Sequence, residues 1–244
     1  MKHISKLALD DYDLIIFDWD GTLLNSAAMY PAWDRLYVRR FYGVDKPESY
    51  FRQLAAQLKQ VNTHSTEESA YFRFLDVEFG DGTTDMQTIW RHVYSVATEI
   101  QGQIEYKSAA PQTLFAIRKK YPDAKLCLAT NSEMRDLLFY SSTNSKTASL
   151  LNPIKFFDSV VALDHITKPK PHPETFTAVI DQYKIEPSRV LIFEDSFKGV
   201  RAAKSTGATV ISVQDEMSDP DRIAIDKLAD FSITDWNEVL RMLK

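Results

Sequence analysis

Two aspartates that follow an apolar run could carry the chemistry of this chain. Residues 14–17 read LIIF, and Asp18 and Asp20 come directly after them. Side chains two residues apart in an extended segment point the same way, so both carboxylates can face one small site at the end of a strand. Two carboxylates held together repel each other, which favours a bound cation or a proton on one of them. Either outcome supplies a group that catalysis can use.

Two plainer interpretations of these aspartates compete with the catalytic one. An EF-hand calcium loop needs a glutamate at its twelfth position, where this chain has Met29. Alternatively, Asp18 and Asp20 simply end a strand in a turn that Gly21 permits. For a lone D-x-D-G pattern this second interpretation is as good as the catalytic one, and the rest of the chain has to decide.

Residues that could bind phosphate follow two further apolar runs. Thr130 and Asn131 come after KLCLA, where a hydroxyl and backbone N–H groups can meet a phosphate oxygen, although taken alone a helix cap is the more common role of such residues. Lys168 and Lys170 alternate with prolines in ITKPKPHPETF, which keeps the loop extended. A surface lysine is usually only a solvated charge, so neither element is strong by itself.

The apolar runs predict the strands of one parallel sheet. They cover residues 14–17, 125–130, 158–163, 190–193, 208–213 and 231–234. Helical patterns alternate with them from residue 109 onward, which predicts a doubly wound α/β fold. Glu194 and Asp195 directly follow the run VLIF, although acids at that place can also cap the next helix. The ends of parallel strands meet at one edge of a sheet, so all these polar residues are expected on the same side of the fold.

The segment between residues 26 and 105 has a different pattern. It shows helical periodicity and no alternating strand signal, with breaks near 43–47, 62–66 and 80–84, so about four helices are expected there. Farther along, residues 141–149 read SSTNSKTAS and are expected to form an exposed polar loop.

Composition narrows the class of protein. The chain has 244 residues, a net charge of −5 and scattered lysines and arginines, so nucleic acid is not an expected partner. No apolar run approaches the roughly 18 residues that span a bilayer, and the first residues lack the apolar core of a signal peptide, so a cytoplasmic protein without a membrane partner is expected. The histidines lack metal-ligand spacing, and Cys127 reads as a small buried residue. The scattered glycines form no nucleotide-binding loop.

Taken in order, the four motifs resemble those of the haloacid dehalogenase superfamily of phosphohydrolases. DWDGT is similar to the first motif of that family, LATNS to the second, KPHPETF to the lysine motif and FEDSFKG to the acidic fourth motif. Aligning Phe176 with the aromatic residue of the lysine motif selects Lys170 rather than Lys168. The resemblance covers nearly the whole chain. It implies a Rossmann-like core from residues 1–25 and 106–244, with an inserted α-helical cap domain at 26–105, as in the branch of phosphoglycolate phosphatase and β-phosphoglucomutase.

The resemblance also implies a role for each motif residue. Asp18 would be the nucleophile that forms an aspartyl phosphate, and Asp20 the general acid and base. Mg²⁺ would be held by Asp18, the backbone carbonyl of Asp20 and Asp195, with Glu194 as a ligand or a support. The phosphoryl oxygens would be bound by Thr130, Asn131 and Lys170.

The function that these expectations favour is a Mg²⁺-dependent phosphatase acting on a small phosphorylated metabolite, as a monomer or weak homodimer. A sugar phosphomutase of the β-phosphoglucomutase type shares all four motifs and stays open as an alternative. Phosphonoacetaldehyde hydrolase is less favoured, because that family has a small residue where Asp20 stands. A non-catalytic binding module is disfavoured, because no motif carboxylate is missing.

Overall fold

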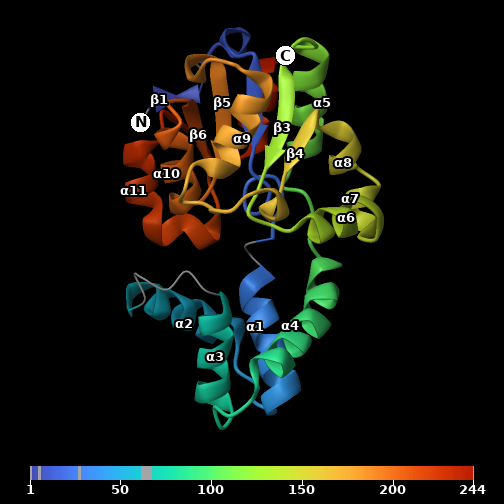
Figure 1. The fold of residues 1–244 in the computed structure, drawn as a ribbon, viewed down its shortest axis with the longest axis vertical. Coiled ribbons are helices and arrows are strands. Elements are labelled where there is room, and N and C mark those ends of the chain that lie inside the picture. The colour runs from blue at the N-terminus through green and yellow to red at the C-terminus, as the bar shows by residue number, and fades with distance from the viewer. Residues whose placement is uncertain (1, 5–6, 27–28, 62–67, 244) are drawn as a thin grey trace. The chain divides into compact units, whose positions relative to one another are not determined.

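The chain divides into two compact units. The computed structural model describes residues 2–4, 7–26, 29–61 and 68–243. One unit, here called the sheet unit, comprises Met1–Ala28 and Ile104–Lys244, and the other, the helical unit, comprises Met29–Gln103 (Figure 1). Within the described residues, no helix combines the length and apolar character needed to cross a bilayer.

The sheet unit is built on a single parallel sheet. In the described residues it has seven strands in the order β1-β7-β6-β5-β2-β3-β4. The strands are β1 (Lys2–His3), β2 (Leu14–Phe17), β3 (Lys125–Ala129), β4 (Ser159–Val161), β5 (Val190–Glu194), β6 (Thr209–Val213) and β7 (Phe231–Ile233). Six of these were predicted. β1 was not, because a two-residue strand has no periodicity to recognise, and β4 is shorter than predicted because a 3₁₀ helix already begins at Leu163.

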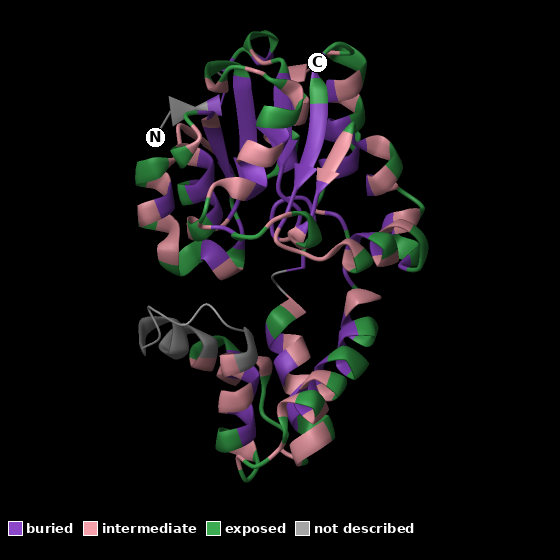
Figure 2. Cartoon of the chain, in the orientation of Figure 1, coloured by how far each residue is buried: buried purple, intermediate pink, exposed green. Residues whose placement is uncertain are grey.

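Helices cover both faces of this sheet, as a doubly wound fold requires (Figure 1). They are α5 (Ala110–Lys120), α6 (Met134–Ser142), α7 (Ser145–Ala148), α8 (Pro153–Phe156), α9 (Glu174–Tyr183), α10 (Phe197–Ser205), α11 (Arg222–Leu228) and α12 (Trp236–Leu243). One face of β2 packs Leu14 and Ile16 into a cluster with residues of α9, α10 and α11. On the other face, the ring of Phe17 lies 6.0 Å from that of Trp236 on α12. Strands buried on both faces explain why the sequence shows unbroken apolar runs (Figure 2).

The order in which strands are added to the sheet reverses at β2, and this reversal positions the site. β2 pairs with β3 on one side and β5 on the other, so Phe17 is in register with both Leu128 and Phe193. In open α/β sheets, a crevice for ligands forms at the carboxyl ends of the strands where the order reverses.

The prediction of a loop at residues 141–149 is wrong, although most of the segment is exposed as predicted. α6 continues to Ser142, and α7 follows at Ser145–Ala148. Asn144 is buried, and its Oδ1 accepts from the N–H groups of Lys146 and Thr147 while its Nδ2 donates to the carbonyl of Ile104. The polar side chains therefore satisfy backbone groups inside the fold, which polar composition alone does not reveal.

The helical unit contains α1 (Tyr30–Tyr42), α2 (Glu48–Val61), α3 (Glu68–Phe79) and α4 (Met86–Gln101), which confirms the prediction of four helices. The predicted break at 62–66 lies outside the described residues. Gly43 ends α1 in the left-handed conformation, and the Asp85 side chain caps the start of α4. Aromatic residues such as Tyr37, Phe51 and Phe72 fill the core of this unit.

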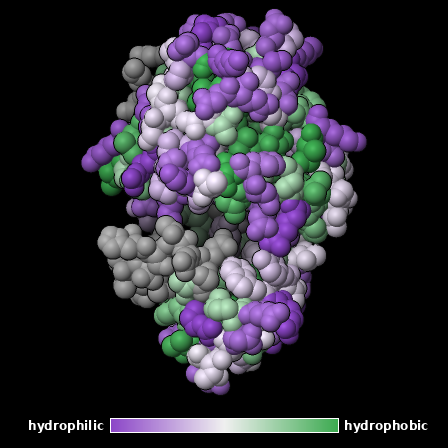
Figure 3. Space-filling model, viewed as in Figure 1, coloured by the Kyte–Doolittle hydropathy of each residue, from purple (hydrophilic) through white to green (hydrophobic). Residues whose placement is uncertain are grey.

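The surface of the chain that Figure 3 shows is mixed, with hydrophilic residues interrupted by smaller hydrophobic areas.

Candidate active site

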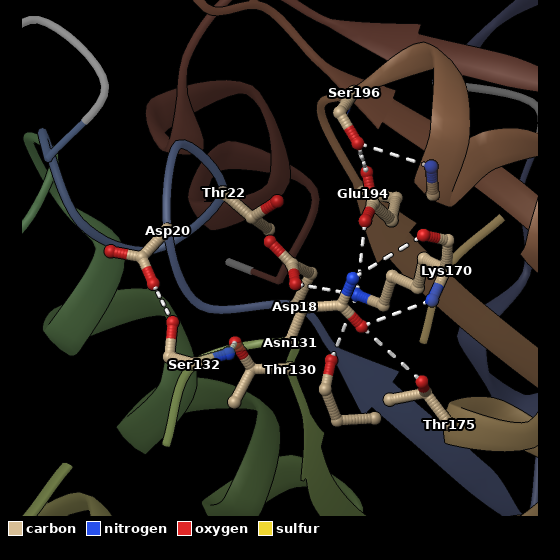
Figure 4. A network of polar contacts seen from close by, with 12 residues as sticks. Asp18, Asp20, Thr22, Thr130, Asn131, Ser132, Lys170, Thr175, Glu194 and Ser196 are labelled. Carbon is tan, nitrogen blue, oxygen red and sulfur yellow. Dashed lines mark hydrogen bonds and ion pairs between the residues drawn. The ribbon is translucent and has the colours of Figure 1, made fainter. Parts of the chain in front are cut away.

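Four charged side chains from three segments meet at the carboxyl edge of the sheet. Asp18 follows β2, Glu194 ends β5 and Asp195 comes next, and Lys170 enters from the loop between β4 and α9 (Figure 4). All four residues are at most 7% exposed. Burial of so many charges is costly unless they are paired or hold an ion, so the cluster is a candidate functional site.

Lys170 lies between two of the carboxylates. Its Nζ is 2.6 Å from Asp18 Oδ1 and 3.0 Å from Glu194 Oε1, and it donates to the carbonyl of Ala129 at 3.0 Å. Burial by itself would lower the pKa of this ammonium, but the Asp18 and Glu194 carboxylates raise it above its ordinary value. Lys168 is exposed, so the lysine that enters the site is Lys170.

Asn131 fixes the backbone of Lys170. Its Oδ1 accepts from the Lys170 N–H at 3.1 Å, and its Nδ2 donates to the Lys170 carbonyl at 3.4 Å. The oxygen and the nitrogen of the Asn131 amide therefore both bond the backbone of the lysine loop. Thr130, which precedes Asn131, is buried, and its hydroxyl accepts from the N–H of Ser132 at 3.0 Å.

Glu194 is held from two sides. Its Oε1 pairs with Lys170, and its Oε2 accepts from the N–H of Ser196 at 2.7 Å and from the Ser196 hydroxyl at 3.1 Å. Burial, together with the negative charge of Asp18, raises the pKa of Glu194 to about 6, and Lys170 opposes this shift. A Cβ on Gly199 would lie 1.7 Å from Glu194 Oε1, so only glycine fits there.

Asp195 is fixed through both of its oxygens. Oδ1 accepts from the hydroxyl of Thr22 at 3.0 Å, and Oδ2 accepts from the hydroxyl of Ser218 at 3.1 Å. Gly21 has a φ of +77°, and a Cβ there would meet Asp195 Oδ2 at 2.5 Å. Burial and the nearby Glu194 carboxylate raise the pKa of Asp195 well above its usual range.

The residues present suit a hard cation. Oxygen atoms of Asp18, Glu194 and Asp195 lie within 4.8 Å of one another. Lys170 pairs with Asp18 and Glu194 but not with Asp195, so the three buried carboxylates hold an excess of negative charge over this lysine. An all-oxygen donor set of this charge fits Mg²⁺ or a similar divalent ion.

Asp20 lies apart from this carboxylate group. Its side chain accepts a hydrogen bond from the Ser132 hydroxyl, on the side away from Lys170 (Figure 4). Desolvation raises the pKa of Asp20 from 3.8 to about 6, although hydrogen bonds from Ser132 and Ser26 oppose the shift. Such a carboxyl can give and take a proton near neutral pH.

Sequence reasoning missed three contributors to this arrangement. Ser132 and Ser196 stand inside the motifs LATNS and FEDSFKG, and that position was the available signal. Ser218 lies in a 3₁₀ helix, Glu216–Asp221, that follows no predicted site. Nothing in the local sequence connects it to Asp195.

Comparisons with known proteins agree with this geometry. The model of the haloacid dehalogenase-like hydrolase family matches residues 12–207. A phosphorylated carbohydrates phosphatase of Thermotoga maritima is 26% identical over 197 residues, covering 80% of this chain and 82% of that protein. The fructose-1-phosphate phosphatase of Escherichia coli is 25% identical over 205 residues, covering 83% and 97%.

The fold is also similar to solved structures. A Thermotoga maritima protein named after β-phosphoglucomutase superposes with a TM-score of 0.75 at 23% identity, covering 95% of this chain and 98% of that one. CbbY from Rhodobacter sphaeroides, solved in complex with phosphate, gives a TM-score of 0.65 at 18% identity, covering 95% and 99%. These likenesses confirm the predicted fold class.

Proposed function

Because the chain belongs to the haloacid dehalogenase-like hydrolases, we propose that it is a Mg²⁺-dependent phosphatase that hydrolyses a small phosphorylated metabolite through an aspartyl phosphate. Its relatives named as phosphatases support a hydrolase acting on phosphate monoesters. The observation that carries the proposal is the buried Asp18 carboxylate, held by Lys170 at 2.6 Å within a group of three carboxylates.

Asp18 is the proposed nucleophile. The Lys170 ammonium donates to Oδ1 of this carboxylate at 2.6 Å, which leaves the second oxygen, Oδ2, for attack on phosphorus. The intermediate is an aspartyl phosphate, from which water then releases inorganic phosphate.

Asp20 is the proposed general acid and base. With a pKa of about 6, it holds a proton in a useful fraction of molecules near neutral pH and can pass it to the leaving oxygen. Once ionised, the same carboxylate takes a proton from the attacking water. The hydrogen bond from Ser132 orients Asp20 for both steps.

The cation site is proposed for Mg²⁺. Asp18, Asp195 and the Asp20 backbone carbonyl would hold the ion, and Glu194 would support it, because Glu194 already pairs with the Lys170 ammonium and the Ser196 N–H, whereas Asp195 accepts from hydroxyl groups. The bound ion would offset the repulsion between the Asp18 carboxylate and an anionic phosphate.

Thr130 and Lys170 are proposed to bind the phosphoryl oxygens by hydroxyl and ammonium. The Asn131 side-chain amide already holds the Lys170 backbone. Asn131 would therefore contribute to phosphate binding through its backbone N–H and by positioning the lysine loop.

The helical segment, about residues 26–105, is proposed to act as a cap that selects the substrate. The names of the phosphatase relatives favour sugar phosphates and other phosphorylated carbohydrates as the substrate class. A cytoplasmic location and a monomer or weak homodimer remain predictions.

The test is a phosphate-release screen over sugar phosphates, glycerol phosphate, nucleotides and phosphoglycolate, with Mg²⁺ and with EDTA. We expect Mg²⁺-dependent release from at least one small ester. Absence of release from every ester, by a folded protein that binds Mg²⁺, would contradict the proposal.

A second incubation separates a phosphatase from a sugar phosphomutase. The enzyme receives β-glucose 1-phosphate with a trace of glucose 1,6-bisphosphate. If glucose 6-phosphate forms faster than inorganic phosphate, the protein is a mutase and the proposed phosphatase function is wrong. We expect inorganic phosphate without the isomer.

A further inference from the structure

Asp195 is held by a part of the chain that lies outside all four motifs. The Ser218 hydroxyl donates to Asp195 Oδ2 at 3.1 Å, opposite the Thr22 hydroxyl on Oδ1. Ser218 and Asp195 are both buried. With one donor on each oxygen, the carboxylate cannot rotate without losing a charge-assisted hydrogen bond.

The position of Ser218 is set by Asp215. The Ser218 N–H donates to the Asp215 carbonyl at 3.0 Å, and Asp215 Oδ1 accepts from the N–H of Met217 at 3.0 Å. Asp215 thereby caps the 3₁₀ helix Glu216–Asp221 and places the serine three residues farther along.

Lys107 in turn fixes Asp215. Its Nζ lies 2.9 Å from Asp215 Oδ2 and donates to the carbonyl of Gln214 at 2.7 Å. Its own N–H donates to the carbonyl of Leu23, in the loop that carries the first motif, at 2.8 Å. Lys107, Gln214 and Asp215 also line a cavity of about 370 Å³ in the sheet unit, which leaves room for a different side chain at position 107.

From these contacts we infer that Lys107, Asp215 and Ser218 form a chain of positioning residues that orients Asp195 as a ligand for the divalent cation. The inference rests on the proposed function, because it needs the cation site. Outer partners of metal ligands typically change metal affinity by about 10–100-fold, because a loosely held carboxylate must be ordered on binding. The alternative is that Lys107 acts only as a positive charge near the site.

Those two roles predict opposite results for Lys107→Met. Removing a positive charge and freeing the Asp215 carboxylate should tighten cation binding if charge alone matters. If Lys107 positions Asp215 and Ser218, the same substitution weakens binding.

The experiment is a calorimetric titration of the metal-free protein with Mg²⁺, without substrate, for wild type, Ser218→Ala, Ser218→Thr, Lys107→Met and the control Ser212→Ala. Ser212 is another buried serine of the sheet unit, and its hydroxyl bonds Arg222 and the Phe231 carbonyl instead of Asp195. Each variant is first checked for folding by circular dichroism. We expect the Mg²⁺ dissociation constant to rise about tenfold for Ser218→Ala and to recover in Ser218→Thr. Lys107→Met should also bind more weakly, and Ser212→Ala should bind like wild type.

Kinetics supply a second readout. The Mg²⁺ concentration for half-maximal phosphate release should rise in Ser218→Ala, with kcat at saturating Mg²⁺ close to wild type. Unchanged Mg²⁺ affinity in Ser218→Ala, equal weakening in Ser212→Ala, or tighter binding in Lys107→Met would overturn the positioning chain. If the wild type itself neither binds Mg²⁺ nor releases phosphate, the proposed function fails instead.

Discussion

Asp76 of the helical unit and the carboxylate cluster of the sheet unit differ in how their buried negative charge is compensated. In the helical unit, Asp76 is fully buried and accepts from Tyr42, from Arg73 and from both the N–H and the hydroxyl of Thr84. In the sheet unit, Asp18 and Glu194 share the ammonium of Lys170, and the neighbouring Asp195 accepts from the hydroxyls of Thr22 and Ser218. Groups of the helical unit thus neutralise Asp76, whereas the carboxylate cluster of the sheet unit keeps a surplus of negative charge.

The difference distinguishes a structural carboxylate from a functional one. A buried charge that stabilises a fold is surrounded by donors, because each unsatisfied oxygen costs free energy. A surplus of negative charge that the protein does not neutralise needs another partner. Here that partner is proposed to be a cation, which also binds the phosphate. Substitutions in the two groups should therefore affect different properties.

The largest effect is expected from Asp18→Asn. An amide fills the same volume but cannot form the aspartyl phosphate, so phosphate release should fall at least about 10³-fold. The metal-free variant should be as stable as wild type or more so, because one charge leaves a repelling cluster. Phosphate release and urea unfolding measure the two outcomes. Retention of more than a few per cent of the wild-type rate would place the nucleophile elsewhere.

The next effect separates Asp20 from Asp195. Asp20→Ala should slow turnover by about 10²–10⁴-fold at every Mg²⁺ concentration, because a proton donor is lost. Asp195→Asn should chiefly weaken Mg²⁺ binding and be partly rescued by excess metal. Rates measured against Mg²⁺ concentration compare the two variants. Rescue of Asp20→Ala but not of Asp195→Asn would show that the roles are exchanged.

Asp76→Asn is the matched substitution in the helical unit. It removes the charge that Arg73 pairs with and disturbs the donors from Tyr42 and Thr84, so the free energy of unfolding should fall by about 3 kcal/mol. At a temperature where the variant stays folded, the chemical step should persist. A variant of wild-type stability in urea unfolding would show that Asp76 is not the structural carboxylate described above.

The last prediction concerns the pH dependence of stability through Asp34 on α1. Its carboxyl is buried and accepts from the Tyr71 hydroxyl at 2.5 Å, and desolvation raises its pKa from 3.8 to about 7. Because folding raises this pKa, the native state binds more protons than the unfolded chain between these two values. The contribution of Asp34 to stability is therefore present at low pH and is lost as the pH rises to about 7.

Unfolding of wild type and Asp34→Asn by urea at several pH values between 4 and 8 measures this contribution. The stability of wild type relative to the variant should decline across that range and level off above pH 7. Parallel curves would show that Asp34 does not titrate in this window.

The sequence predicts the part of the site that lies at strand ends. Asp18 and Asp195 each follow an unbroken apolar run, and parallel strands bring such ends together. The resemblance to the family's lysine motif, with Phe176 as its aromatic residue, selected Lys170 over Lys168, and the structure places Lys170 beside Asp18. These inferences succeed because they depend on local pattern and on a single topological rule.

The residues that escaped prediction act through tertiary contacts. Lys107 and Ser218 are separated by more than a hundred residues and meet only through Asp215. Asn144 lies in a segment whose composition resembles an exposed loop, yet its amide bonds the Ile104 carbonyl inside the fold. Such polar side chains have no periodicity, because their partners are individual backbone groups.

The central claim is that Asp18 becomes phosphorylated during turnover. The direct measurement is borohydride reduction of enzyme quenched during hydrolysis of its best substrate, followed by peptide mass spectrometry. Borohydride converts an aspartyl phosphate to homoserine, so homoserine at position 18 is expected in samples with substrate and Mg²⁺ and not in samples without substrate. Homoserine at another aspartate, or an unmodified position 18 in repeated quenches throughout the first turnover, would contradict the account.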